Sequence, residues 1–142
     1  MWLLFVYKVP SEPSARRVYV WRKLRRLGAI LLHDALWVLP ATDHTREQLQ
    51  WLAAEVAEMQ GEATLWEARL AFTGQAENLI QHFTVQVEAA YQKILDELIG
   101  GDPDLEALSR RYQQVKAQDY FHSPLGARTR EALVAARGGT EP

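Results

Sequence analysis

The sequence predicts an α+β fold in which a four-stranded antiparallel sheet is followed by a helical extension. Over roughly the first seventy residues, short apolar runs rich in aromatic and β-branched residues alternate with two amphipathic stretches. Proline or glycine stands where most of these segments should end. The resulting order β, α, β, β, α, β is the split βαβ pattern of ferredoxin-like folds.

The first strand is expected at residues 2–9, where aromatic and β-branched side chains form an apolar run that a proline-rich turn ends. A helix should follow at residues 14–27. Ser11 or Ser14 is placed to cap its N-terminus. Gly28 supplies the stop at its C-terminus.

This first helix has two contrasting sides. At helical spacing its apolar side is formed by Val20, Trp21, Leu24 and Leu27. Its opposite, basic side is formed by Arg16, Arg22, Lys23, Arg25 and Arg26. Arg17 falls inside the apolar arc, where a charge needs a partner such as Glu62, Glu67 or a bound anion. We favour a structural ion pair over a ligand there.

Two short apolar strands are expected at residues 29–33 and 35–39, with a tight hairpin around His33-Asp34 between them. Asp43 is placed to cap a second helix over residues 43–60. The alternation that follows, at residues 62–70, predicts the fourth strand.

The chain is expected to divide into a ferredoxin-like domain at residues 1–72 and a helical extension at residues 73–138 that packs on it. The extension shows helical periodicity and repeated start signals. Its helices are expected at residues 75–99, from Asp102-Pro103 onward and from Ser123-Pro124 onward.

Composition removes several classes of chemistry. The chain has no cysteine, which excludes disulfides, thiolate zinc sites and cysteine nucleophiles. No two of its four histidines stand at i, i+4 spacing, so we expect no metal site and no cofactor. His33 and Asp34 are adjacent in a tight turn and do not face each other, so we expect no catalytic residues and no enzyme. The apolar run at residues 2–6 is too short for a membrane span or a signal segment, which favours a cytoplasmic protein.

The net charge of −2 hides a strong asymmetry. Six of the sixteen basic residues stand in the eleven positions from Arg16 to Arg26. Such a face can meet DNA phosphates or an oxyanion, or it can be a solvated face that aids solubility. Ser11, Ser14 and the first helical turn form a candidate oxyanion cradle, since helix N-termini bind such anions. The alternative is that both serines only cap the helix.

Several segments resemble the N-terminal domain of the ChrB chromate-resistance regulators. They are Val9-Pro-Ser-Glu-Pro-Ser14, Val20-Trp-Arg22, Leu27-Gly-Ala29, Trp37-Val-Leu-Pro40, Gly61-Glu-Ala63, Asp119-Tyr-Phe121 and Ser123-Pro124. The resemblance implies a chromate-responsive transcriptional regulator of a chromate-efflux operon. The family usually carries a second, C-terminal domain, so this chain is expected to be a stand-alone version or a fragment. The family's late aromatic segment commonly begins Arg-Asp, whereas Gln118 precedes Asp119 here.

The strand and helix order also resembles CRISPR-associated spacer-acquisition nucleases. Those place an acidic metal ligand at the end of the first strand, where this chain has Lys8, so nuclease activity is not expected. Two functions stay open. One is a DNA-binding module that senses chromate or a similar oxyanion. The other is a non-catalytic interaction domain. A homodimer is expected in either case, because sheet edges and aromatic residues such as Trp51 are available for contact.

Overall fold

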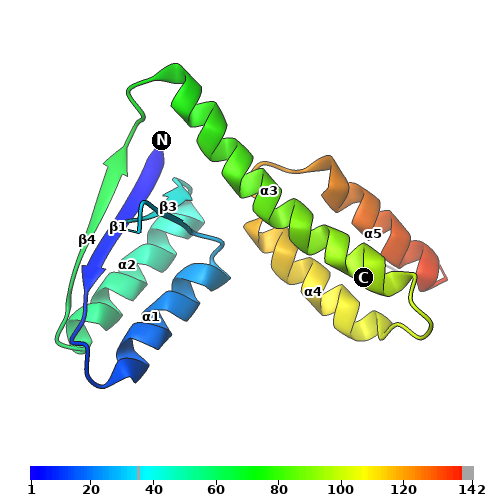
Figure 1. Cartoon of the computed structure of the whole chain (residues 1–142), viewed down its shortest axis with the longest axis horizontal. Coiled ribbons are helices and arrows are strands. Elements are labelled where there is room, and N and C mark those ends of the chain that lie inside the picture. The colour runs from blue at the N-terminus through cyan, green and yellow to red at the C-terminus, as the bar shows by residue number, and fades with distance from the viewer. Residues whose placement is uncertain (35, 139–142) are drawn as a thin grey trace. The chain divides into compact units, whose positions relative to one another are not determined.

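The computed structural model describes residues 1–34 and 36–138, and within them it contains four strands and five helices. The chain divides into two compact units, Met1–Thr73 and Gly74–Pro142. The first unit holds the sheet and two helices, and the second holds three helices (Figure 1). The predicted α+β class is therefore confirmed. The expected packing of the helical extension on the sheet domain stays a prediction.

The elements lie close to their predicted ranges. The first unit contains β1 (Trp2–Lys8), α1 (Ser14–Arg26), β2 (Ile30–Leu32), β3 (Leu36–Pro40), α2 (Asp43–Glu58) and β4 (Glu62–Ala68). The second contains most of α3 (Thr73–Leu98), then α4 (Leu105–Gln118) and α5 (Pro124–Ala136).

The four strands form one antiparallel sheet in the order β2-β3-β1-β4, as the sequence predicted for a four-stranded antiparallel sheet. Central strand β1 places Phe5 opposite Trp37 on β3 and Leu65 on β4. Opposed side chains share a face of the sheet. Helices α1 and α2 lie together on one side of the sheet (Figure 1). The buried core of this unit includes Leu3, Phe5, Val20, Leu24, Trp37, Leu39, Leu49, Leu52 and Val56.

The predicted hairpin between the two short strands is confirmed, because β2 pairs antiparallel with β3 from Ile30–Val38 to Leu32–Leu36. His33 and Asp34 follow β2 with φ of 52° and 55°. This left-handed conformation suits tight hairpin turns, and Asn, Asp and His adopt it more readily than most side chains. Residue 35, where the second of these strands was expected to start, lies outside the described residues.

Helix α2 starts differently from the prediction. Its cap is Thr42 rather than Asp43. The Thr42 hydroxyl accepts from the backbone N–H of Thr45 at 3.0 Å, and the Thr45 hydroxyl accepts from the N–H of Thr42 at 2.9 Å. Thr45 is fully buried, and its hydroxyl donates to the carbonyl of Pro40 at 2.6 Å. This reciprocal capping box satisfies two backbone N–H groups at once. Asp43 is also a good capping residue, but Thr42 occupies the cap position because Thr45 completes the box with it.

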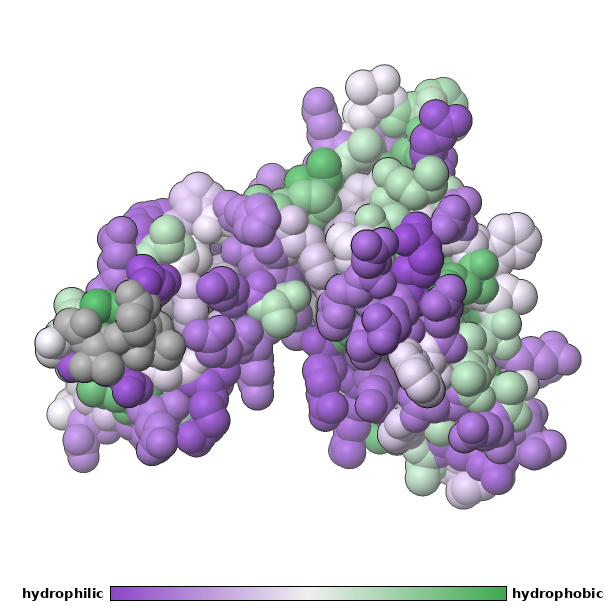
Figure 2. Space-filling model, turned by 180° about the vertical axis from the view of Figure 1, so that it is seen from behind, coloured by the Kyte–Doolittle hydropathy of each residue, from purple (hydrophilic) through white to green (hydrophobic). Residues whose placement is uncertain are grey.

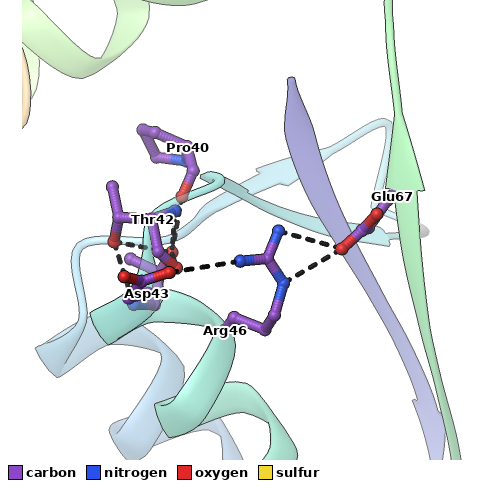
Figure 3. Close-up of polar contacts among 6 residues, drawn as sticks. Pro40, Thr42, Asp43, Arg46 and Glu67 are labelled. Atoms are coloured by element: carbon purple, nitrogen blue, oxygen red, sulfur yellow. Dashed lines mark hydrogen bonds and ion pairs between the residues drawn. The ribbon is translucent and has the colours of Figure 1, made fainter.

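Asp43 instead belongs to the first turn of α2, where its charge complements the helix dipole. Arg46 lies one turn further and links this helix to the sheet (Figure 3). Its guanidinium makes two contacts of 2.9 Å to the Glu67 carboxylate on β4, and it lies 3.8 Å from Asp43. Glu67, which was considered as a partner for Arg17, is therefore paired with Arg46.

Replacing Thr42 by Ala should lower the free energy of unfolding by about 1 kcal/mol, because the first turn of α2 loses its side-chain acceptor. Thr42→Ser keeps the hydroxyl and is the matched control. All five tryptophans lie between Trp2 and Trp66, so tryptophan fluorescence during urea denaturation reports on the sheet unit. Equal midpoints for the Ala and Ser variants would show that the cap does not stabilise this helix.

The second unit has its own apolar core, made by one face of each helix. It consists of Val87, Tyr91, Ile94, Leu108, Tyr112 and Leu133, with Leu98, Val115 and Leu125 packed against them. Helix α4 is capped by Asp104, two residues later than the predicted start at Asp102. The predicted start of α5 is confirmed, with Ser123 as its cap. None of the described helices is both long enough and apolar enough to cross a bilayer.

The turn between α4 and α5 is fixed to α3 by hydrogen bonds. The Tyr91 hydroxyl on α3 donates to the Asp119 carboxylate at 3.0 Å, and that carboxylate also accepts from the backbone N–H of Ser123. The Ser123 hydroxyl donates to Glu88 at 2.9 Å. Gly126 packs so closely here that a Cβ atom would lie 2.9 Å from the Tyr91 oxygen. The late aromatic-acidic segment is thus a structural joint of the helical unit.

Candidate functional site

Helix α1 carries the basic residues, and its buried side determines where they point. Val20 and Leu24 are fully buried against the sheet unit. With that side fixed, the remaining arc of the helix faces outward. Four of the cationic side chains there are exposed and Lys23 is half-buried. We call the set the basic surface: Arg17, Arg22, Lys23, Arg25 and Arg26.

The structure exchanges the predicted roles of Arg16 and Arg17. Arg17 was expected in the apolar arc, but it is exposed. Arg16 was expected in solvent, but it is half-buried and donates to the carbonyl of Met59 at 2.9 Å, at the C-terminal end of α2. The error came from counting Trp21 as core. Its side chain is 50% exposed, so the buried arc is narrower and lies closer to Arg16.

This exchange changes the expected effect of each substitution. Arg16→Ala should cost about 1 kcal/mol of stability, because it removes a charged donor from a carbonyl at the end of α2. Arg17→Ala should stay within about 0.5 kcal/mol, as is usual for exposed helix positions. Urea denaturation followed by tryptophan fluorescence compares the two. A larger loss of stability for Arg17→Ala than for Arg16→Ala would contradict this, and would support the prediction from the sequence that Arg17 lies on the apolar side.

One flank of the basic surface faces α2. The Tyr19 hydroxyl donates to the Glu55 carboxylate, and this hydrogen bond is the main reason that the pKa of Tyr19 is raised. The ammonium of Lys23 lies 5.5 Å from the centre of the Tyr19 ring. Beyond them a depression of about 490 Å³ is bordered by Lys23, Arg26 and Trp51. Trp51, which the sequence offered for contact in a dimer, is 64% exposed.

The other flank faces the strands. The guanidinium of Arg25 lies 5.9 Å from the centre of the Trp21 ring, one helical turn away. Arg17 and Trp21 border a second depression, of about 340 Å³, together with Lys8 at the end of β1. Burial raises the pKa of the Tyr7 hydroxyl there. A hydrogen bond with Trp37 and the positive charge of Arg17 both lower that pKa, but by less than burial raises it.

The two serines do not cap α1, so this part of the prediction is wrong. Pro13 occupies the cap position and no side chain makes a capping hydrogen bond. Proline has no side-chain acceptor with which to replace the serine. Ser11 and Ser14 are both exposed. Their role in an oxyanion cradle stays a prediction.

The described residues contain no group of three or more His, Asp and Glu side chains arranged to hold a metal ion.

The sequence alone could not place Lys8 beside α1, because that proximity depends on how the sheet and helix pack. The one available signal was a cation at the end of an otherwise apolar strand.

Residues 17–100 match the family described as "Protein ChrB, N-terminal". This range is more than half of the 142-residue chain. The chain belongs to this family. A curated relative, Protein ChrB of Cupriavidus metallidurans (strain ATCC 43123 / DSM 2839 / NBRC 102507 / CH34), is 34% identical over 70 residues. The alignment covers 49% of this chain and 22% of that protein. No solved structure matches the chain.

The ChrB N-terminal match includes the whole basic surface and three of the four strands. Residues Val9–Ser14 and Asp119–Pro124 lie outside it, so their likeness to the family stays a prediction. Within the match, Trp37 is buried in β3. Gly61 lies against the Lys8 carbonyl and the Val56 side chain, where no larger residue fits without a shift. Val20 is core, whereas its neighbours Trp21 and Arg22 are exposed.

Proposed function

We propose that this chain is the nucleic-acid-binding module of a chromate-responsive regulator, with α1 as its contact to DNA. Membership of the ChrB N-terminal family supports a place in a chromate-resistance system. The relative that the chain matches is named Protein ChrB, and this chain spans 22% of it. The regulatory role of the whole protein, its DNA and its response to chromate or a similar oxyanion are therefore all part of the proposal, as is a cytoplasmic location.

The basic surface is the observation that carries this proposal. From Arg17 to Arg26 the helix extends about 14 Å, at about 1.5 Å per residue. A DNA duplex carries roughly eight phosphate charges over that length. Five cations anchored on a helix whose other side is buried meet such a polyanion without rearrangement. No metal or catalytic group is needed for this role, so the proposed module is not an enzyme and uses no cofactor.

We infer a ferredoxin-like arrangement for the sheet unit. Counted from the other edge, the strand order is β4-β1-β3-β2. Helix α1 connects β1 to β2 and α2 connects β3 to β4. These two connections and this order support the split βαβ topology.

The test is a titration of labelled duplex DNA from a chromate operon with the purified chain, in the presence and absence of chromate. We expect binding that weakens steeply as salt rises, and a change in affinity when chromate is added. Binding to the same DNA that is weak at low salt and independent of salt would count against a basic contact surface. Salt-dependent binding without any effect of chromate would place the response elsewhere in the regulator.

The second candidate is a dimeric interaction domain. Among the described strands β4 pairs with β1 alone, so its other edge is open along Glu62–Ala68. Trp66 on β4 and Val6 on the neighbouring β1 are exposed, at 58% and 39%. Figure 2 shows apolar residues in green beside hydrophilic ones in purple on the part of the first unit that faces the viewer. Open edges and exposed apolar side chains favour association with a second sheet.

A homodimer formed through this edge should appear in light scattering at tens of micromolar, a rough range for weak dimers. Trp66→Lys should shift the molecules to monomers, because a lysine on an edge strand opposes pairing. Trp51→Lys, on α2, is the matched control. If the unaltered chain is a monomer at these concentrations, the proposed homodimer is wrong.

A further inference from the structure

We propose that the depression between α1 and the strands holds a single unstacked base of a nucleic acid that lies along the basic surface. This inference rests on the proposed nucleic-acid contact and names the kind of ligand that one part of it accepts. Residues of three neighbouring segments line the depression: the end of β1, the exposed side of α1 and the β2–β3 hairpin. Its lining residues include Tyr7, Lys8, Arg17, Trp21, Asp34 and Trp37.

The size and walls of the depression fit a flat aromatic ring. Its volume of about 340 Å³ lies at the lower end of the range of roughly 300–1,000 Å³ for small-ligand pockets, which suits one base rather than two. Trp37 is 5% exposed and shares a hydrogen bond with Tyr7, so both rings are held in place. Trp21 is 50% exposed and offers an accessible ring. Proteins that bind single strands present such rings to successive bases.

The charges around the depression fit a nucleotide rather than a neutral ring. Lys8 and Arg17 converge on it from a strand and a helix, and the described part of the chain contains no ion pair to either. Arg25 lies over Trp21 and extends the cationic path toward the rest of α1. Cations alternating with an exposed indole form the combination that follows a phosphate backbone while its bases stack.

Asp34 adds a preference among bases. It lines the depression from the hairpin, on a different segment from Lys8 and Arg17. A carboxylate accepts hydrogen bonds, so it favours a base that presents an exocyclic amino group, as cytosine, adenine and guanine do. Thymine has no such group. The phosphate is expected on the Lys8 and Arg17 side, because Asp34 repels it.

A base paired inside a duplex cannot enter, so single-stranded or locally unpaired DNA is the ligand class. Fluorescence anisotropy with labelled ten-nucleotide single strands, oligo-dC, oligo-dT and an abasic strand, tests this beside a duplex. Trp21→Ala should weaken oligo-dC binding about tenfold, since loss of one stacking ring typically costs that much or more. Its salt slope should not change, because no charge is removed. Phe72→Ala, at an exposed aromatic residue outside the basic surface and the open edge of β4, should have no effect.

Two further results are expected. The abasic strand should bind the unaltered chain and Trp21→Ala equally, and Asp34→Ala should narrow the gap between oligo-dC and oligo-dT. The inference is overturned if the abasic strand binds the unaltered chain as tightly as oligo-dC, or if Trp21→Ala weakens duplex and single strand alike. Salt-dependent duplex binding in either case leaves the proposed function intact. Absence of binding to every strand and to the duplex overturns both.

Discussion

The Arg22→Ala, Lys23→Ala, Arg26→Ala variant should bind duplex DNA more weakly and with a shallower dependence on salt. Each phosphate contact adds about 0.9 to the slope of log affinity against log salt, so losing three lowers the slope by about 2.7. Between 50 and 200 mM salt, the unaltered chain should then lose about 40-fold more affinity than the variant. Fluorescence anisotropy at four salt concentrations measures both slopes.

The matched control removes the same charge from the helical unit. Arg110, Lys116 and Arg128 are exposed on α4 and α5, and their replacement by alanine changes the net charge equally. This second variant should keep the full slope, because nonspecific attraction by net charge is weak beside direct phosphate contacts. Equal slopes for the two variants would show that net charge, and not the basic surface, governs binding.

Tyr91→Ala should be the most destabilising substitution in the helical unit, at about 3–5 kcal/mol. The ring is 1% exposed, and its centre lies 6.1 Å from that of Tyr112. Burial, and then the hydrogen bond to Asp119, raise the pKa of Tyr91, so the phenol stays a donor at neutral pH. Removing the ring leaves a cavity and an Asp119 carboxylate without this donor.

Tyr91→Phe separates the two contributions. It keeps the ring, so it should cost about 1–3 kcal/mol for the carboxylate that loses its donor. Tyr19→Ala is the matched tyrosine control on α1, where the side chain is half-exposed and the loss should be smaller. Thermal unfolding followed by far-ultraviolet circular dichroism compares the three. A Tyr91→Ala variant as stable as Tyr19→Ala would contradict the assignment of Tyr91 to the core of the helical unit.

The sequence predicted the elements well where one local pattern determines them. The alternation of residues 62–70 indicated β4, which ends at Ala68, and Ser123-Pro124 marked the start of α5. Side-chain placement was harder at Trp21, because tryptophan suits both a core and an exposed surface beside cations. Treating Trp21 as a core residue placed the predicted buried side of α1 at Arg17. In the structure Arg16 is half-buried and Arg17 is exposed.

Contacts between segments that are distant in the sequence leave no local sequence pattern from which they could be predicted. Tyr91 and Asp119 are 28 positions apart, and Lys8 and Arg17 border the same depression only because a strand packs beside a helix. The helix start at Thr42 was missed for a different reason. Thr42 and Asp43 are both good capping residues, and the partner hydroxyl of Thr45 decides between them.

Helix α1 is proposed as the surface that contacts nucleic acid. The most direct measurement is a two-dimensional amide NMR titration of the 142-residue chain with short duplex DNA at low salt. This role of α1 predicts that the largest shift changes fall within residues 17–26 and the neighbouring end of β1, and that they disappear for the Arg22→Ala, Lys23→Ala, Arg26→Ala variant. Shift changes concentrated in α4 and α5, with α1 unaffected, would contradict it.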